Sequence, residues 1–330
     1  MPEISVIIPV FNGEKTIQET IQSVLDQSFT DLEVIVINDG SQDSTLSIVS
    51  TITDPRVRVF SYENAGLANS RNRGFSQATG EYVSFLDADD LWTVDKLEAQ
   101  YKALQANPQA AVAYSWVDYI DESGKFFRSA SHTTANGDVY EQLLLNNFLE
   151  NGSNPLIRRQ ALADVGGFDS QLASSEDWDM WLRLAARYKF VAVSSPQVLY
   201  RKSSHSMSCN ALKMEAESLR MLDKAFSQAP QALQHLKRNS TANLYHYLTF
   251  KSFEGTPKRK NGLLAARFFC SAIANNPSML LSWKTVLRVL AKVSLVTLLP
   301  PEQSQSAIKA AKRVVRLERV KKPKSISTQS

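Results

Sequence analysis

Short runs typical of strands alternate with segments of helical spacing over the first 116 residues, and this alternation restricts the fold more than any other feature. The runs cover residues 4–10, 33–37, 56–62, 82–86 and 112–116. Between them, apolar residues recur every three or four positions, as at Ile17, Ile21 and Val24. Two helices are expected in the first part of the chain, one around residues 17–25 and one that ends near residue 52. Two more are expected over 66–78 and over about 93–104. The sequence thus predicts an α/β fold with a mostly parallel sheet flanked by helices.

Polar residues directly follow three of these strands. The stretches are FN at 11–12, NDG at 38–40 and DADD at 87–90. Ligands of mostly parallel sheets bind at the carboxyl ends of the strands. We therefore expect the three stretches to form one site.

The DADD stretch brings three carboxylates together, although like charges at this spacing repel one another. One interpretation is an acidic turn that begins the following helix. A calcium loop is excluded, because Leu91 and Trp92 occupy its middle positions. The other interpretation is a Mg²⁺ or Mn²⁺ site that also takes oxygens from a ligand phosphate. Arg71 and Arg73 precede the acidic strand and either donate to that phosphate or lie on a solvated face.

Four stretches between about residues 3 and 208 occur together in order: ISVIIPVFNGEKTIQETIQSVLDQSF, EVIVINDGSQDST, ENAGLANSRNRGFSQATGEYVSFLDADDLW and GGFDSQLASSEDWDMWLRLA. They resemble the family 2 glycosyltransferases of the non-processive, bacterial type, which have the GT-A fold. The Q-x-x-R-W motif of the processive polysaccharide synthases does not occur in this sequence.

The resemblance implies a nucleotide-sugar donor, with a uridine nucleotide as the default. Pro9, Phe11 and Asp39 would line the pocket of the nucleotide base, and Arg71 would approach the nucleotide. Thymidine and guanosine nucleotides stay open as alternatives, and the sequence does not identify the donor sugar.

The resemblance also assigns the carboxylates of the DADD stretch. Asp87 would lie beside the ribose, and Asp89 would bind the Mn²⁺ or Mg²⁺ ion that bridges the diphosphate. A metal at this place would offset the charge that develops on the nucleoside diphosphate leaving group.

The stretch SSEDWDMWLRLAARY at 174–188 begins like a helix, because it has a capping-box pattern and acids in its first turn. At helical spacing, Asp177 shares a stripe with Trp181, Leu184 and Tyr188, so it heads the inward face. We predict that Asp177 is the catalytic base. The resembled family also places its base in an E-D pair here.

Two further acids in this stretch receive other roles. Glu176 is predicted to tune the site as the neighbour of the base. Asp179 is in phase with Arg183 and Arg187, which is typical of an exposed, structural ion-paired face.

The stretch LYRKSSHSMS at 199–208 ends the resemblance. Arg201 is predicted to contact the diphosphate. Family members often carry a histidine two residues after this arginine, but that position is Ser203 here. His205 comes two positions later and is expected in an exposed loop.

The pattern changes near residue 210, which divides a predicted catalytic domain at 1–210 from a helical C-terminal region at 211–330. Residues 279–299 are very apolar, but Lys284, Arg288 and Lys292 form a cationic stripe along them. The stripe argues against a membrane span and favours an amphipathic helix, followed by a basic tail. This helix either packs on the protein or binds an anionic membrane surface.

The predicted activity is inverting, metal-dependent hexosyl transfer to a hydroxyl of a saccharide or lipid-linked acceptor, in cell-surface polysaccharide or glycolipid assembly. A nicotinamide dehydrogenase is disfavoured because the first strand is not followed by G-x-G-x-x-G. A catalytically silent nucleotide-sugar-binding or scaffolding member of the same fold stays open. No nucleic-acid partner is expected. The first strand begins within a few residues, so we expect no signal peptide and a cytoplasmic protein, peripheral at the inner face of the plasma membrane if the helix binds lipid.

Overall fold

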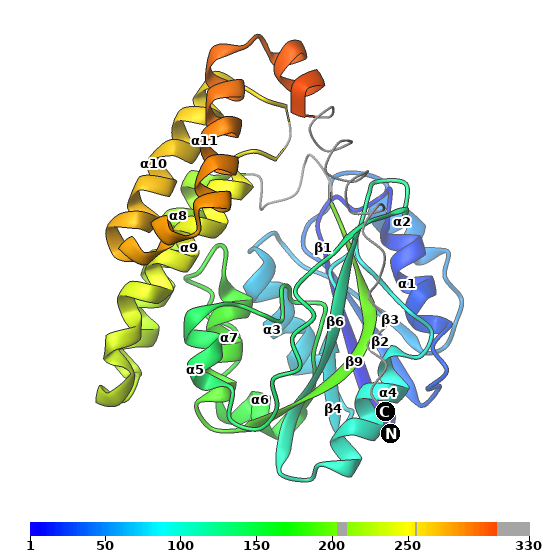
Figure 1. Cartoon of the computed structure of the whole chain (residues 1–330). Coiled ribbons are helices and arrows are strands. Elements are labelled where there is room, and N and C mark those ends of the chain that lie inside the picture. The colour runs from blue at the N-terminus through cyan, green and yellow to red at the C-terminus, as the bar shows by residue number, and fades with distance from the viewer. Residues whose placement is uncertain (203–209, 255, 309–330) are drawn as a thin grey trace, which may run out of the picture. The chain divides into compact units, whose positions relative to one another are not determined.

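A computed structural model describes residues 1–202, 210–254 and 256–308 (Figure 1). The chain forms two compact units, each described here by itself. The first holds residues 1–208 and 216–237, and the second holds 209–215 and 238–330. His205 and the basic tail lie outside the described residues.

Within the described residues, nine strands of the first unit form one mixed sheet. Its order is β3-β2-β1-β4-β8-β6-β9-β5, with β7 beside β6. The strands are β1 (Ile4–Val10), β2 (Leu32–Asn38), β3 (Val57–Ser61), β4 (Tyr82–Phe85), β5 (Leu91–Trp92), β6 (Ala110–Ile120), β7 (Phe126–Ser129), β8 (Leu156–Arg158) and β9 (Lys189–Arg201). The five predicted strands are confirmed, whereas β5, β7, β8 and β9 were not predicted.

Strand direction brings the polar stretches to one edge of the sheet. Strands β1 to β4 are parallel to one another. Strand β8 is antiparallel to both β4 and β6, so β6 runs in the same direction as β4. Strand β9 is parallel to β6. The carboxyl ends of β1, β2, β4, β6 and β9 therefore meet at the same edge.

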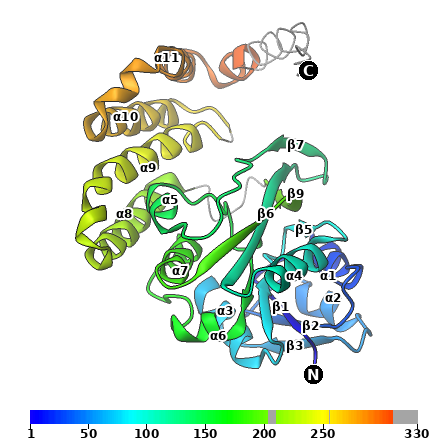
Figure 2. The ribbon, with the colours of Figure 1, turned by 60° about the horizontal axis from the view of Figure 1, so that its bottom comes forward.

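Helices cover both faces of this sheet (Figure 2). Those before residue 186 are α1 (Ile17–Leu25), α2 (Thr45–Ser50), α3 (Leu67–Gln77), α4 (Lys96–Ala106), α5 (Tyr140–Leu145), α6 (Arg159–Asp164) and α7 (Glu176–Ala185). The helices predicted over 66–78 and 93–104 are confirmed as α3 and α4, with small differences at their ends.

The core explains why the first strand is a continuous apolar run. Ile4, Val6 and Ile8 pack in the cluster that also contains residues of α1 and α4. Ile7 points to the opposite face, where a Cβ at Gly74 of α3 would lie 2.3 Å from its Cγ2 atom. Both faces of β1 are buried, so its residues do not alternate with polar ones. The glycine lets α3 approach the sheet closely.

The remaining elements are helical, as predicted. They are α8 (Ala211–Gln228), η2 (Gln231–Leu236), α9 (Lys237–Lys251), α10 (Arg259–Asn275), η3 (Pro277–Leu281) and α11 (Trp283–Leu298). The helix predicted over 279–299 is thus a 3₁₀ turn followed by a shorter α-helix. None of the helices in the described ranges has the length and apolar character needed to span a bilayer.

Candidate active site

Three loops at the carboxyl edge have strained backbones. Asn12, Glu150 and Ser175 have φ angles of 53°, 72° and 64°, in the left-handed region. Asn12 follows β1, Glu150 precedes the loop at 151–153, and Ser175 immediately precedes α7. Strained residues of this kind cluster at functional sites, where the surrounding structure holds them in place.

Asp90 is the buried anchor of the acidic stretch. Its side chain accepts hydrogen bonds from Ser153 Oγ at 2.6 Å and from the Arg201 backbone N–H at 2.9 Å. Burial, followed by the charges of Asp89 and Asp87, raises the pKa of Asp90 well above its ordinary value. Asp90 thus connects the loop at 151–153 and the end of β9 to the turn between β4 and β5, which carries the other two carboxylates.

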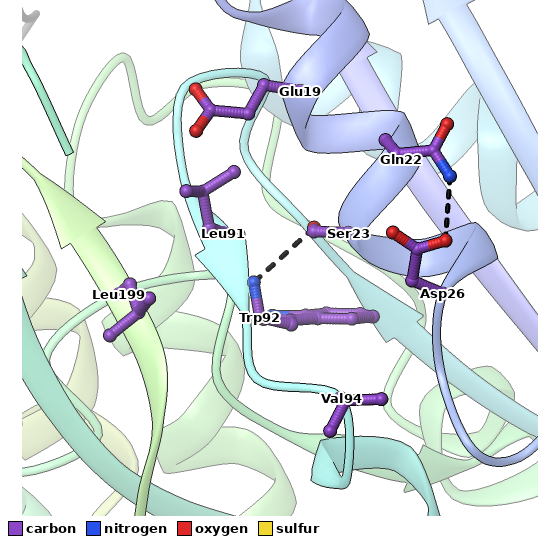
Figure 3. A pocket seen from close by; sticks show the side chains of 8 residues that line it. All are labelled: Glu19, Gln22, Ser23, Asp26, Leu91, Trp92, Val94 and Leu199. Carbon is purple, nitrogen blue, oxygen red and sulfur yellow. Dashed lines mark hydrogen bonds between the residues drawn. The ribbon is translucent and has the colours of Figure 1, made fainter.

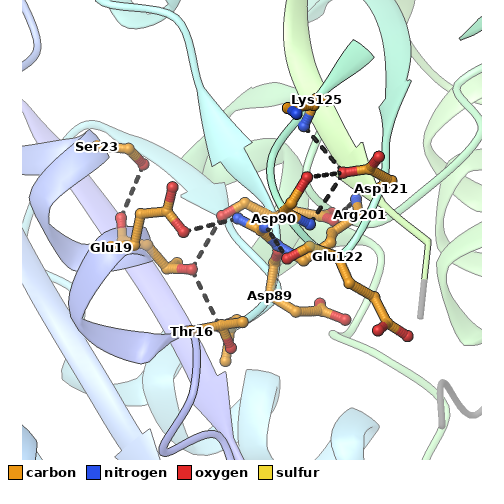
Figure 4. A network of polar contacts seen from close by, with 12 residues as sticks. Thr16, Glu19, Ser23, Asp89, Asp90, Asp121, Glu122, Lys125 and Arg201 are labelled. Atoms are coloured by element: carbon orange, nitrogen blue, oxygen red, sulfur yellow. Dashed lines mark hydrogen bonds and ion pairs between the residues drawn. The ribbon is translucent and has the colours of Figure 1, made fainter. Parts of the chain in front are cut away.

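Arg201, the last residue of β9, contacts the turn that carries Asp89 (Figure 4). Its Nε atom donates to the Asp89 backbone carbonyl at 2.8 Å, and Nη1 donates to the Glu122 carbonyl at 3.2 Å. Nη2 forms an ion pair with Glu19 Oε2 at 2.8 Å. All three guanidinium nitrogens thus have protein partners, so Arg201 orders the acidic stretch in this structure. Its contact with a diphosphate stays a prediction.

Asp89, the predicted metal ligand, is a partly exposed carboxylate with a raised pKa. Burial, followed by the charge of Asp87, raises the pKa of Asp89 to about 6, and Arg201 opposes this only in part. The side chains of Asp87 and Asp89 are both partly exposed. No set of three His, Cys, Asp or Glu residues in the described part of the chain could hold a metal alone. Two such carboxylates fit Mg²⁺ or Mn²⁺ when ligand phosphates complete the coordination.

Arg71 connects the turn after β4, which carries Asp87, to Glu176 of α7. Its Nη2 atom lies 2.6 Å from Asp87 Oδ1, and its Nη1 atom lies 2.7 Å from Glu176 Oε1. The side chain is only 1% exposed, and its guanidinium lies 5.2 Å from the Phe168 ring centroid. A Cβ on Gly152 would lie 2.2 Å from Nη2, so the loop at 151–153 also packs on the guanidinium. One arginine therefore fixes two predicted parts of the site relative to each other.

Asp177 differs from its neighbour Glu176 because no cation forms an ion pair with it among the described residues. Within those residues, the hydrogen bond to its side chain comes from the Trp178 N–H, at 2.7 Å from Oδ1. Burial, followed by the charge of Glu176, raises the pKa of Asp177 to about 7, while Arg71 lowers it in part. A carboxylate that is held in place but not ion-paired can accept a proton near neutral pH.

Asp179 is buried, and its prediction as an exposed residue was wrong. Its side chain is 5% exposed and forms ion pairs with Arg183 at 2.7 Å and with Lys224 of α8 at 2.9 Å. The predicted pair with Arg183 is confirmed, whereas Arg187 instead donates to the Asp164 carbonyl. Helical phase alone missed the burial, because it depends on a helix about 45 residues further along the chain.

Asp39 organises the loop between β3 and α3. Its carboxylate accepts hydrogen bonds from the backbone N–H groups of Ala65 and Gly66, at 3.0 and 2.9 Å, and from Arg73 at 3.1 Å. Gly66 has a φ angle of 88°, a conformation that favours glycine. Asp39 thus shapes the edge of the predicted base pocket through the backbone of this loop.

The other predicted pocket residues lie on β1 and directly after it. Pro9 is buried within the strand, whereas the Phe11 side chain is 52% exposed at its end. An exposed aromatic ring at this edge provides a flat surface on which a nucleotide base can stack.

A shallow hollow of about 330 Å³ lies between α1 and β5 (Figure 3). Its lining residues are Glu19, Gln22, Ser23, Asp26, Leu91, Trp92, Val94 and Leu199. None of them is a predicted site residue, and the charged ones are acidic. A diphosphate would be repelled there, so we assign the candidate site to the strand edge.

Solved structures of glycosyltransferases share this fold. Staphylococcus aureus TarS 1-349 in complex with UDP-GlcNAc matches with a TM-score of 0.55 and 19% identity, over 86% of this chain and 92% of that chain. The mannosyltransferase PcManGT of Pyrobaculum calidifontis, in complex with GDP-Man and Mn²⁺, matches with a TM-score of 0.57 and 22% identity, over 94% and 86%. These similarities confirm the predicted GT-A fold.

Sequence comparisons identify the family. An uncharacterized glycosyltransferase of Rickettsia bellii is 32% identical over 310 residues, which cover 89% of this chain and 41% of that protein. The UDP-Glc:alpha-D-GlcNAc-diphosphoundecaprenol beta-1,3-glucosyltransferase WfgD of Escherichia coli is 30% identical over 216 residues, which cover 64% and 81%. The chain spans less than two thirds of several curated relatives, as in the Rickettsia protein. A profile described as "Glycosyltransferase like family 2" matches residues 5–252. The chain therefore belongs to glycosyltransferase family 2.

Proposed function

We propose that the chain transfers a hexose from a UDP-sugar to an acceptor hydroxyl, with inversion at the anomeric carbon and with a divalent metal. One observation carries this proposal. Arg71 pairs with Asp87 and with Glu176, and these two ion pairs hold the turn after β4 and α7 together. Asp177 has no cationic partner among the described residues. A donor-binding element and an available base thereby share one site.

Asp177 removes the proton of the acceptor hydroxyl as that oxygen attacks the anomeric carbon, while the bond from this carbon to the diphosphate oxygen breaks and UDP leaves. Because its pKa is about 7, a large fraction of Asp177 is deprotonated near neutral pH, and the carboxylate still binds a proton more strongly than an ordinary aspartate does. Glu176 carries the ion pair with Arg71, so its negative charge beside Asp177 helps to raise that pKa. A single displacement needs one base and no covalent glycosyl intermediate, which is why we assign inversion.

The carboxylate of Asp89, with Asp87 beside it, would hold the Mn²⁺ or Mg²⁺ ion. A bound metal would supply positive charge at the diphosphate of the donor. Phe11 offers its ring to the nucleotide base, while Asp39 and Arg201 keep the surrounding backbone in place.

Similar proteins support the choice of substrates. The Escherichia coli relative is named for a reaction that uses UDP-Glc and a diphosphoundecaprenol-linked acceptor. The TarS structure contains UDP-GlcNAc, whereas the Pyrobaculum structure contains GDP-Man. We therefore assign a uridine nucleotide and a saccharide acceptor carried on a lipid diphosphate, in cell-surface polysaccharide or glycolipid assembly.

The experiment is a panel of UDP-, GDP- and dTDP-sugars, assayed for donor hydrolysis and for transfer to a short lipid-linked saccharide with Mn²⁺ or Mg²⁺. We expect turnover with a UDP-sugar, loss of turnover in Asp177→Asn, and unchanged donor binding by calorimetry in that variant. Donor binding without hydrolysis or transfer by the native chain would instead support the catalytically silent interpretation. No binding of any nucleotide sugar would refute the proposal.

A further inference from the structure

Helix α11 uses one face to pack within the second unit. Val289 and Val296 are buried. A Cβ on Gly262 of α10 would lie 2.6 Å from Thr297 Cγ2 and 3.3 Å from Val296 Cβ, so the two helices approach closely at this glycine. Figure 1 shows α10 and α11 side by side. Packing on α10 thus explains why Val289 and Val296 of α11 are buried.

A second apolar face of the same helix is exposed to solvent. We call it the outer face, and it consists of Trp283, Leu287, Leu290 and Leu298, which are each between 51% and 80% exposed. At about 100° per residue, these four positions fall on one stripe, roughly a third to half a turn away from Val289. Leu280 and Leu281, directly before α11, are also exposed. Single exposed leucines are ordinary on a surface, but a continuous stripe marks an interaction site.

Exposed cations flank the outer face. Lys284 and Arg288 each follow one of its residues, and α11 contains no acidic residue. Residues 238–308 together contain nine Lys and Arg but only two Glu and no Asp. Three of these cations form the exposed stretch KRK at 258–260, which directly precedes the helix contact at Gly262. Lys284 and Arg288 thus lie beside the outer face in a part of the chain that is rich in basic residues.

We infer that the outer face binds an anionic membrane surface, with α11 lying in the interface plane. Trp283 and the leucines enter the boundary between headgroups and acyl chains, while Lys284 and Arg288 contact anionic headgroups. A protein partner fits less well, because lysine is depleted at the core of protein interfaces. This inference goes beyond the proposed function, since lipid binding needs neither donor nor catalysis.

The structure also corrects which residues would enter the lipid. Val286 and Val293 are apolar as well, so the sequence of α11 does not by itself separate them from the leucines of the outer face. Both valines are only partly exposed, and they lie on the side of the helix that carries Val289 and Val296. Lys292 lies 5.3 Å from the Phe253 ring, so its stem packs within the unit rather than beside the outer face. Trp283, the leucines and two cations remain for the membrane.

The test uses the full chain with vesicles of phosphatidylcholine, with or without 30% phosphatidylglycerol, at low and high salt. Trp283 is the most exposed of the tryptophans within the described residues, so its emission should shift to the blue on binding. We expect binding only to anionic vesicles, with affinity falling as salt rises. Leu287→Gln should weaken binding about tenfold. The double variant Lys284→Gln, Arg288→Gln should weaken it about 30-fold, because each cation near an anionic surface contributes a factor of about five.

Two matched variants control the experiment. Leu46→Gln, at an exposed leucine of α2, should bind vesicles as the native chain does. Trp283→Phe should still sediment with vesicles but lose most of the spectral shift. If Leu287→Gln binds like Leu46→Gln, the outer face is not the membrane surface. If Leu287→Gln instead converts a dimer of the native chain into a monomer, and no form binds vesicles, a second copy covers the face and the inference is overturned. Donor hydrolysis by the same samples reports the proposed function separately.

Discussion

Replacing the predicted base should make the protein more stable while it removes transfer. The pKa of Asp177 is about 7, against an ordinary value of 3.8, because burial and Glu176 disfavour its charged form. A pKa difference of this size corresponds to about 4 kcal/mol of destabilisation at high pH. Asp177 is partly exposed, so solvent screening reduces this figure, and about 1–2 kcal/mol is a reasonable expectation.

The sign follows from linkage. A carboxyl group with a raised pKa in the folded state favours folding while it is protonated, and this advantage is lost as the pH rises through about 7. Asparagine does not titrate. Asp177→Asn should therefore match native stability only below about pH 4, exceed it by a small margin at pH 5, and exceed it most at pH 8, by about 3–6 °C in melting temperature for a unit of this size.

The assay is thermal unfolding of both proteins at pH 5, 6, 7 and 8, without metal or donor. Asp31→Asn serves as the control, because Asp31 is an exposed carboxylate and its replacement should give no pH-dependent difference. The same Asp177→Asn sample should lose transfer by about 10²–10⁴ while it retains donor affinity. A melting temperature that is equal to or below the native value at pH 8 would refute the burial argument, and retained transfer would refute the role of base.

Three further substitutions test the surrounding structure. Asp89→Asn should abolish metal-stimulated turnover, since it removes a hard ligand from a site with few protein ligands; full activity in excess chelator would contradict this. Asp179→Asn should lower the free energy of unfolding by about 1–3 kcal/mol, as measured by denaturant unfolding, because Arg183 loses its carboxylate partner while Lys224 keeps its ion pair with Asp169. Gly152→Ala should reduce kcat at least tenfold, because the added Cβ displaces the Arg71 guanidinium from its two ion pairs; an unchanged kcat would show that the guanidinium can move without cost.

Local periodicity was sufficient for the first half of the sheet and insufficient for the second. Strands β1, β2 and β4 are buried, mostly apolar runs, and β3 alternates apolar with polar residues, so each is visible in the sequence by itself. Strand β9 was missed because its inner residues alternate irregularly with Ser and Pro, and because it pairs with β6 through several register shifts. Strands β5 and β8 have two and three residues, which is too short for any periodic signal.

The predicted site residues were placed at the correct edge, but their mutual contacts could not be derived from spacing. Asp87 and Glu176 are 89 positions apart, and the residue that joins them, Arg71, lies on a third element. The sequence indicates an arginine that faces a nucleotide, whereas the fold shows that its guanidinium is already neutralised by two carboxylates. The same reasoning applies to Arg201, whose four chain partners come from α1, the DADD stretch and the turn after β6.

These contacts suggest why the site contains more acids than its chemistry needs. Asp90 receives the Ser153 hydroxyl and the Arg201 backbone, and Glu176 receives Arg71, so both are occupied by the protein itself. Burial and the charge of Asp87 raise the pKa of Asp89, and burial and the charge of Glu176 raise the pKa of Asp177. A metal-bound diphosphate would stabilise the charged form of Asp89, and the proton of the acceptor hydroxyl would neutralise Asp177. Each acid with a proposed catalytic role, Asp89 or Asp177, thus lies next to an acid that is ion-paired with Arg71.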